Sequence, residues 1–115
     1  MVAGKVYLSN AFSLQMVNDY KGCEIEIENI SIEELKEILK IVKFISVIGH
    51  EDTARVLSGL LNVEVPHNRE SIKLTTKDIL IVAQVVGGRL PEGCTSLPCG
   101  ISMKFKIVRV KIGEK

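Results

Sequence analysis

The sequence predicts a single α/β domain, in which a mixed β-sheet of about five or six strands is flanked by two main helices. The chain has 115 residues, enough for one modest hydrophobic core. Segments with an apolar residue at every second position indicate strands, and they alternate along the chain with segments of helical periodicity. Clusters of glycine, proline and small polar residues separate these segments, as turns require. We therefore treat residues 1–115 as one domain.

The first half of the chain contains a clear helix start between two short strands. Residues 5–8 are expected to form a strand, and residues 24–28 a half-buried strand, because glutamate and isoleucine alternate there. Ser31 and Glu34 form a capping-box pattern, in which each side chain can satisfy the backbone amide of the other residue. Apolar residues follow at helical spacing, which predicts a helix over residues 32–42.

The second half begins with a compact β-rich run over residues 44–48, which we interpret as a central strand. A second helix follows, with one apolar face made by Ala54, Leu57, Leu60 and Leu61. Further strands are expected over residues 72–74, 79–86 and 101–112, with a turn at 75–78. The apolar phase of the last strand slips after Ile107, which predicts a β-bulge near Ile107 and Val108.

Composition narrows the class of protein. Fifteen lysines and arginines face 14 aspartates and glutamates, so the chain lacks the strong positive charge of dedicated duplex-DNA binders. No apolar run approaches the length of a membrane span, and the N-terminus lacks the apolar stretch of a signal peptide. We therefore expect a cytoplasmic protein. In that compartment Cys94 and Cys99 are expected as free thiols, with a disulfide between them as the alternative.

His50 is the first candidate functional residue, because it lies where a predicted strand ends and a helix begins. Free amides and a partial positive charge at a helix N-terminus bind phosphate groups. Gly49 allows the backbone to approach such a ligand closely. A histidine at this point can protonate a leaving alkoxide near neutral pH. Spacing alone fits a purely structural histidine better than a catalytic one.

Two arginines and a glutamate are further candidates. The Arg69 guanidinium, just before a predicted strand, can clamp a phosphate through paired hydrogen bonds. Arg89 and Glu92 stand in a glycine-bracketed loop, residues 87–93, which can close over a ligand. Glu92 can accept a hydrogen bond from a ribose hydroxyl or orient His50. For each of them, a solvated surface side chain is the competing explanation.

Several other chemistries fit the sequence poorly. It contains no phosphate-binding P-loop, no dinucleotide-binding glycine motif and no nucleophile elbow. Carboxylates do not cluster with histidine at metal-ligand spacing, and the separation of Cys94 and Cys99 does not match a zinc knuckle. We therefore expect no metal and no cofactor. A nuclease on this chain would use the 2′-hydroxyl of its substrate as the nucleophile. Asn10 and Ser13 offer neutral polar contacts for such a substrate.

Four separated motifs together carry a family resemblance. They are LSNAFS at residues 8–13, KFISVIGHEDTA at 43–54, VEVPHNR at 63–69 and RLPEG at 89–93. With these motifs in register over roughly residues 5–93, the chain resembles the viral anti-CRISPR ring nucleases directed against type III CRISPR defence, and their cellular relatives.

The resemblance implies a metal-independent nuclease that cleaves cyclic tetra-adenylate, the second messenger of type III CRISPR defence. It implies linear di-adenylate products with 2′,3′-cyclic phosphate ends, and a homodimer that holds the ring at its interface. A viral member would act in the host cytoplasm. The residues that correspond to the family's site are His50 and Glu92 for catalysis, and Asn10, Ser13, Gly49, Thr53, Arg69 and Arg89 for substrate binding.

The loop after the predicted strand at residues 79–86 departs from the family pattern. Gly87 and Gly88 make its hinge looser than in many relatives, Pro91 stands where a second glutamate is common, and residues 94–100 form only a short loop. Two other functions stay open at this level. One is a protein that sequesters cyclic oligoadenylate without cutting it. The other is a nucleic-acid-binding viral regulator, although the near-zero charge predicts no stable DNA partner.

Overall fold

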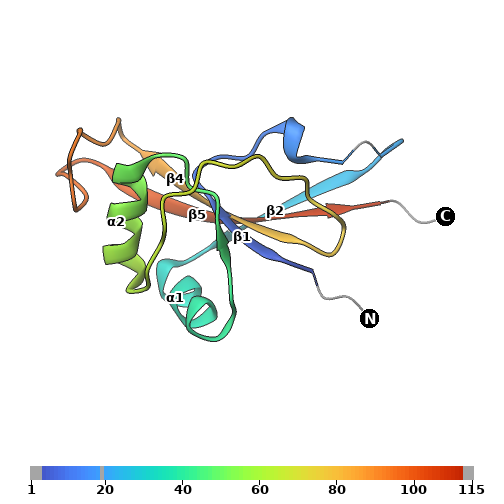
Figure 1. Cartoon of the computed structure of the whole chain (residues 1–115), viewed down its shortest axis with the longest axis horizontal. Helices are drawn as coiled ribbons and strands as arrows, with labels where there is room; N and C mark the ends of the chain where they lie inside the picture. Colours follow the sequence, from blue (N-terminus) through green and yellow to red (C-terminus); the bar gives the residue numbers. More distant parts are fainter. Residues whose placement is uncertain (1–3, 19, 113–115) are drawn as a thin grey trace.

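The computed structural model describes residues 4–18 and 20–112, which form a five-stranded β-sheet with two α-helices on one face (Figure 1). In chain order the elements are β1 (Val6–Ser9), the 3-10 helix η1 (Leu14–Met16), β2 (Glu24–Ile30), α1 (Ile32–Ile41), β3 (Ile45–Ser46), α2 (Glu51–Leu61), β4 (Ile79–Val86) and β5 (Ser102–Lys111). This architecture confirms the predicted fold class. Within the described ranges, no helix has the length and apolar character that crossing a membrane requires.

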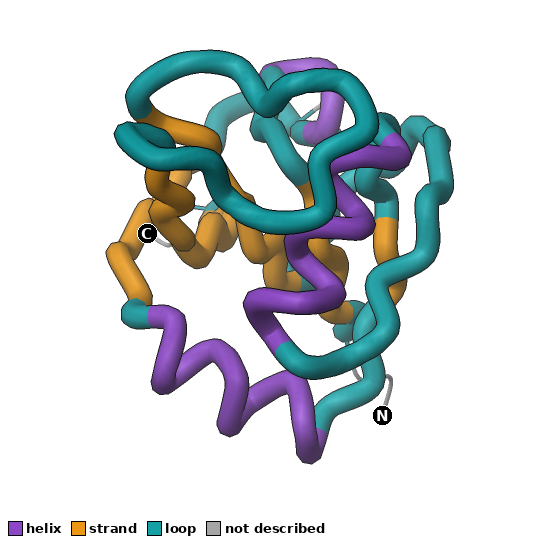
Figure 2. Tube along the Cα trace, turned by 90° about the vertical axis from the view of Figure 1, so that its left-hand side faces the viewer, coloured by secondary structure: helices purple, strands orange, loops and turns teal. Residues whose placement is uncertain are grey.

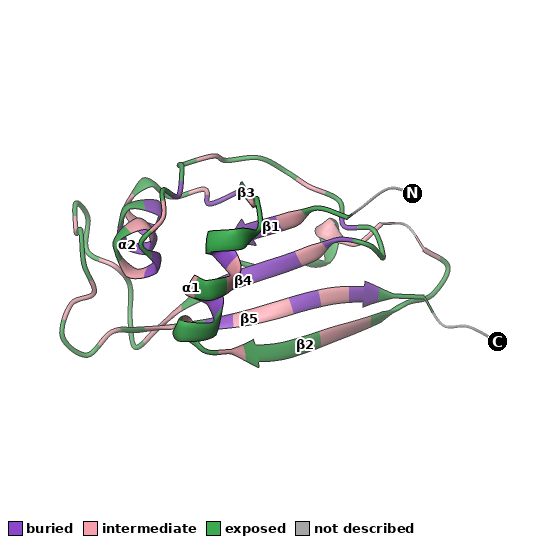
Figure 3. Ribbon diagram, turned by 90° about the horizontal axis from the view of Figure 1, so that it is seen from below, coloured by how far each residue is buried: buried purple, intermediate pink, exposed green. Residues whose placement is uncertain are grey.

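The sheet is mixed, with the strand order β2-β5-β4-β1-β3. Strand β1 pairs in parallel with both β3 and β4, whereas β5 runs antiparallel to β4 and β2. Figure 3 shows the consequence for burial: β4, inside the sheet, is buried over residues 80–83, and β2, at the edge, is mostly exposed. The parallel strands β1, β3 and β4 bring their carboxyl ends to one edge of the sheet.

Both faces of the sheet are apolar, but they are covered differently. On one face, Leu35 and Leu39 of α1 and Leu57 of α2 pack against Leu8 and Ile81 in one buried cluster. On the other face a second cluster is made by Tyr7, Val47, Leu74, Leu80, Val82, Val108 and Val110. The segment around η1 lies on this second face, opposite the helices (Figure 1). The core therefore has two layers, one on each face of the sheet, and only one of these layers is covered by helices.

The two helices form where the local sequence predicts them. The Ser31 hydroxyl accepts a hydrogen bond from the Glu34 amide at 3.1 Å, and the Glu34 carboxylate accepts one from the Ser31 amide at 3.2 Å. The predicted capping box is therefore confirmed. Helix α2 begins after His50 and ends at Asn62, which adopts the left-handed conformation common at helix C-termini. Its buried residues include Val56, whereas the predicted core residue Leu60 is only half-buried.

Two strand predictions need correction. The run at 44–48 is not a central strand: only Ile45–Ser46 joins the ladder, as the outermost strand, and Val47 and Ile48 are buried outside it. Residues 72–74 form no strand, and Leu74 makes one isolated bridge to Val17 while covering the second face. Val47, Ile48 and Leu74 are thus buried without belonging to a regular strand.

The predicted bulge in the last strand is also absent. The pairing of β4 with β5 is continuous through Ile107 and Val108, which oppose Ile81 and Leu80. The apolar phase slips because the strand is buried on different faces along its length. Phe105 packs under the helices, whereas Val108 and Val110 belong to the cluster on the other face.

Candidate functional site

The candidate site lies at the edge where β1, β3 and β4 end, and His50 stands at its centre. In sheets with parallel strands, ligands bind outside the carboxyl ends of the strands. His50 is the N-cap of α2: its backbone is extended, with φ −124° and ψ 127°, and its carbonyl accepts from the Ala54 amide at 3.1 Å. Its side chain makes no capping hydrogen bond and is exposed. The imidazole is therefore free to meet a ligand.

A cavity of about 480 Å³ opens beside this imidazole. It is lined by His50, Asp52, Thr53, Val85, Gly88, Arg89 and Leu90. These residues come from the start of α2, the end of β4 and the loop that follows β4, so the fold joins segments that are far apart in the sequence. Three residues predicted from the sequence, His50, Thr53 and Arg89, thus meet at one cavity.

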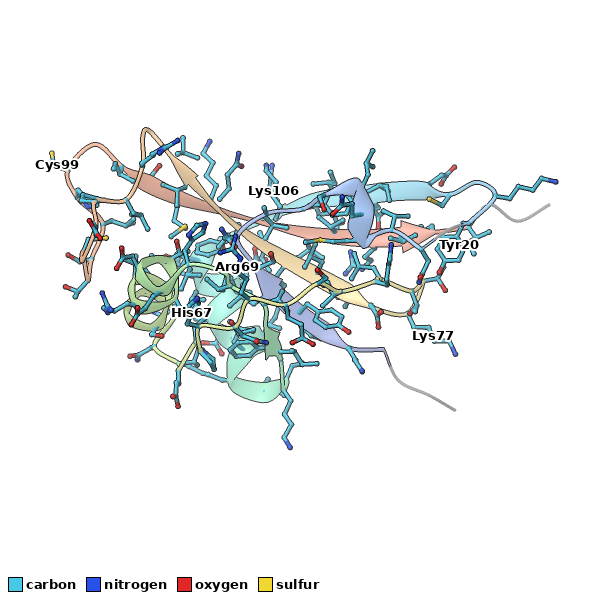
Figure 4. The ribbon with its side chains drawn as sticks, turned by 45° about the horizontal axis from the view of Figure 1, so that its top comes forward. Tyr20, His67, Arg69, Lys77, Cys99 and Lys106 are labelled. Carbon is cyan, nitrogen blue, oxygen red and sulfur yellow. The ribbon has the colours of Figure 1, made fainter. Side chains whose placement is uncertain are left out.

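Arg69 reaches the same edge through a segment that runs beside the end of β3. Ile48 and His67 form an isolated parallel bridge, and the Asn68 amide donates to the Ile48 carbonyl at 2.9 Å. This pairing carries Arg69 to Gly49: a Cβ added at Gly49 would lie 3.4 Å from Arg69 Cγ. Figure 4 shows Arg69 and His67 on this segment, close to α2. The aliphatic stem of Arg69 therefore packs on the backbone next to His50, although Arg69 does not line the 480 Å³ cavity.

At this edge of the sheet, the carboxylates of the first turn of α2 are paired with an arginine, whereas two other arginines are not paired with a carboxylate among the described residues. The first turn of α2 carries Glu51 and Asp52, and Arg55 forms ion pairs with both, at 3.3 and 3.1 Å. In the part of the chain that the structure describes, neither Arg69 nor Arg89 forms an ion pair with a carboxylate. Both guanidinium groups are exposed. Two positive charges are thus available to an anion at this edge.

Glu92 lies in the loop after β4, and the structure does not bring it to His50. It is exposed and is not among the residues that line the cavity. Among the hydrogen bonds of the described residues, none joins Glu92 to the imidazole. The same loop is attached to α2 at the next residue, where the Gly93 amide donates to Asp52 Oδ2 at 3.1 Å. Asp52 was not singled out by the sequence, although it lies in the same motif as His50.

Asn10 and Ser13 line two other cavities on the second face of the sheet. Asn10 shares a cavity of about 380 Å³ with Gln84 and Lys106, and Ser13 lines one of about 390 Å³ near Glu70. Within one chain, the polar residues of the N-terminal loop therefore do not reach the cavity beside His50. Gln84 and Lys106 carry no sequence motif that would have marked them.

Among the described residues, the side chains that could bind a metal or form a disulfide are not assembled into either kind of site. Residues 4–18 and 20–112 contain no group of three or more His, Cys, Asp or Glu side chains placed to hold a metal ion. Cys94 and Cys99, both in the loop between β4 and β5, are free thiols in the structure. Figure 4 places Cys99 at the outer end of the molecule, on the side of α2.

Comparison with known proteins places the chain in a viral family. Residues 6–98 match the model of the STIV B116-like family. The chain is 38% identical to uncharacterized protein 26 of Sulfolobus islandicus filamentous virus over 88 residues, which cover 76% of this chain and 73% of that protein. It is 43% identical to uncharacterized protein ORF117 of Acidianus two-tailed virus over 70 residues, 59% of each chain.

The fold agrees with a solved member of the same family. The structure of B116 from Sulfolobus turreted icosahedral virus superimposes with a TM-score of 0.77 and 26% sequence identity, covering 92% of this chain and 99% of that chain. The chain therefore belongs to the STIV B116-like family, and the relatives named above come from archaeal viruses.

Proposed function

We propose that this member of the STIV B116-like family is a metal-independent ring nuclease that cleaves cyclic tetra-adenylate and thereby switches off type III CRISPR signalling. The observation that carries the proposal is the meeting of His50, Thr53 and Arg89 at one cavity beside the N-terminus of α2. The four sequence motifs that resemble the viral ring nucleases include all three residues. No metal and no cofactor enters the proposed reaction.

The local chemistry suits a phosphodiester. Amides at the first turn of a helix offer hydrogen bonds to phosphate oxygens. Gly49 has no side chain that would keep a ligand from the backbone, and Arg69 packs beside it. The exposed guanidinium groups of Arg69 and Arg89 can form charge-assisted hydrogen bonds with phosphate. A nearly neutral chain can thus concentrate positive charge where the ligand binds.

The proposed step is an internal transfer within the substrate. The 2′-hydroxyl oxygen of one nucleotide attacks the adjacent phosphorus, the bond from phosphorus to the 5′-oxygen breaks, and a 2′,3′-cyclic phosphate forms. The 2′-hydroxyl loses its proton to solvent, and the leaving 5′-oxygen takes a proton from the His50 imidazolium. The arginines stabilise the negative charge that develops on the phosphoryl oxygens.

The proposal includes a homodimer with the ring at the interface. A cyclic tetranucleotide can present two-fold symmetry, and a dimer with a two-fold axis presents one His50 to each of two opposite phosphodiesters. Two cuts then give two identical di-adenylates. The dimer also doubles Arg69 and Arg89, which supplies four cations for four phosphates.

The proposal is tested by incubating the purified chain with cyclic tetra-adenylate in excess EDTA and separating the products by chromatography. We expect the ring to disappear and linear di-adenylate with a 2′,3′-cyclic phosphate to accumulate. An intact ring after long incubation, or cleavage only after a divalent metal is added, would overturn the proposal.

A second candidate is a protein that binds the ring without cutting it. It is favoured by the exposed imidazole of His50, which no side chain orients among the described residues, and by the absence of Glu92 from the residues that line the cavity. Tight binding of the ring with no product in the same experiment would support this alternative.

A further inference from the structure

We propose that Asp52 is a positioning residue, which holds the loop between β4 and β5 against α2 and so sets the place of Arg89 relative to His50. The proposal rests on the proposed function only for its consequence in ring binding. The attachment itself, the hydrogen bond from the Gly93 amide to Asp52, is a property of the ligand-free protein. Asp52 and Arg89 line the same cavity.

Few hydrogen bonds hold the loop over residues 87–101 in place. Its other backbone hydrogen bonds are local turns, from the Cys94 amide to the Pro91 carbonyl and from the Ile101 amide to the Pro98 carbonyl. Figures 1 and 2 show the loop projecting at one end of the molecule, beside the start of α2. Across the described residues, the bond from the Gly93 amide to Asp52 Oδ2 is the one hydrogen bond that joins this loop to an element outside it.

Asp52 is itself fixed by a second contact. Arg55 donates from Nη1 to Asp52 Oδ1 at 3.1 Å, while Asp52 Oδ2 accepts from Gly93 at 3.1 Å. The carboxylate therefore uses each oxygen for a different partner and bridges the helix to the loop. A negative charge in the first turn of a helix is also stabilised by the helix dipole. Its side chain is 29% exposed, against 70% for neighbouring Glu51.

A comparison with Glu51 distinguishes the two roles that a carboxylate in the first turn of α2 can have, which are to stabilise the helix and to hold the loop. It pairs with the same arginine, Arg55, and benefits from the same helix dipole, but among the described residues no hydrogen bond or ion pair joins it to the loop. If Asp52 served only the helix, removing Glu51 or Asp52 would have similar consequences. The attachment predicts that only Asp52 affects the loop and, through Arg89, the binding of the ring.

The first test uses amide hydrogen exchange in the ligand-free protein, measured by NMR. In Asp52→Ala, we expect the exchange of the Gly93 amide to accelerate at least about fivefold, because its charged acceptor is lost. In Glu51→Gln, it should stay within about twofold of the wild type. Asp52→Asn retains one carbonyl oxygen and should recover part of the protection. Equal acceleration in Asp52→Ala and Glu51→Gln, or no change in either, would overturn the proposal.

The second test measures equilibrium binding of cyclic tetra-adenylate. We expect Asp52→Ala to weaken binding about tenfold in the wild-type background and to have almost no effect in an Arg89→Ala background, because the two residues act through one loop. Effects of Asp52→Ala that are equal in both backgrounds would overturn the positioning role. A wild-type protein that neither binds nor cuts the ring would contradict the proposed function, while the exchange experiment would still decide the attachment.

Discussion

Gly87, at the base of the loop that carries Arg89, offers a sharp test of the backbone geometry. Its φ is +101°, a region that costs an L-residue about 1–2 kcal/mol. A Cβ placed on Gly87 would also collide with the carbonyl oxygen of Gly100 on the returning side of the loop. Displacing packed atoms of this kind costs about 1–3 kcal/mol. Gly87→Ala should therefore lower the free energy of unfolding by about 2–5 kcal/mol.

Gly100→Ala is the matched control for this substitution. Gly100 lies beside Gly87 at the base of the loop and has a φ of +86°, but a Cβ there would meet no atom within 4 Å. Gly100→Ala should therefore lower the free energy of unfolding only by the cost of the backbone conformation, about 1–2 kcal/mol. The assay is urea unfolding followed by circular dichroism, with every variant at one protein concentration because an oligomer gains stability with concentration. Equal losses for Gly87→Ala and Gly100→Ala would refute the predicted collision.

Three further predictions follow from individual contacts. Ser31→Ala removes the hydroxyl that accepts from the Glu34 amide and should cost about 1 kcal/mol in urea unfolding, and an unchanged midpoint would contradict the capping box. Burial raises the pKa of Tyr7 above its ordinary 10.0, and nearby carboxylates add to the rise. The folded state therefore holds the phenol proton more tightly, so stability is complete below about pH 10 and falls as the pH rises through the folded pKa. Tyr7→Phe should remove this part of the alkaline loss, and unfolding curves with the same pH slope in both proteins would disprove it. Arg69→Met keeps the stem that packs on Gly49 but removes the charge, so calorimetry should show ring binding weakened at least about tenfold with an unchanged unfolding midpoint.

Local signals in the sequence were sufficient to predict the helices and the position of His50. The capping box of Ser31 and Glu34 acts over three residues, and α2 begins directly after His50, as its strand-to-helix position predicted. The strand over β4 was also predicted with its observed bounds, because the apolar run is uninterrupted and ends at glycines. Structure that depends only on neighbouring residues can therefore be predicted from the sequence alone.

The strand errors have one physical cause. An apolar run shows that side chains are buried, but it does not show what covers them. Val47 and Ile48 are buried beside a two-residue edge strand, and Leu74 is buried in an irregular segment. In β5, apolar residues that face opposite sides of the sheet imitate the phase slip of a bulge. The position of each segment in the sheet decides these cases, and that position depends on pairings between distant residues.

The candidate site also depends on contacts between residues that are distant in the sequence. Arg69 reaches Gly49 through the bridge between Ile48 and His67, and the Asp52 carboxylate meets Gly93 from 41 residues away. Neither contact has a signature in the local sequence. His50, Thr53 and Arg89 were identified together through the resemblance of four motifs, and the fold explains how these segments come to one edge.

The most direct test of the central claim is the single-turnover rate of cyclic tetra-adenylate cleavage in EDTA, compared between the wild type, His50→Ala and His67→Gln. If His50 is the general acid, His50→Ala should slow cleavage at least about hundredfold while binding of the ring stays within about tenfold of the wild type. The control His67→Gln replaces the other histidine of the chain with a side chain that can still hydrogen-bond to the Gly49 carbonyl, which His67 Nε2 approaches to 3.3 Å, so it should cleave at nearly the wild-type rate. Cleavage by His50→Ala at the wild-type rate would contradict the account.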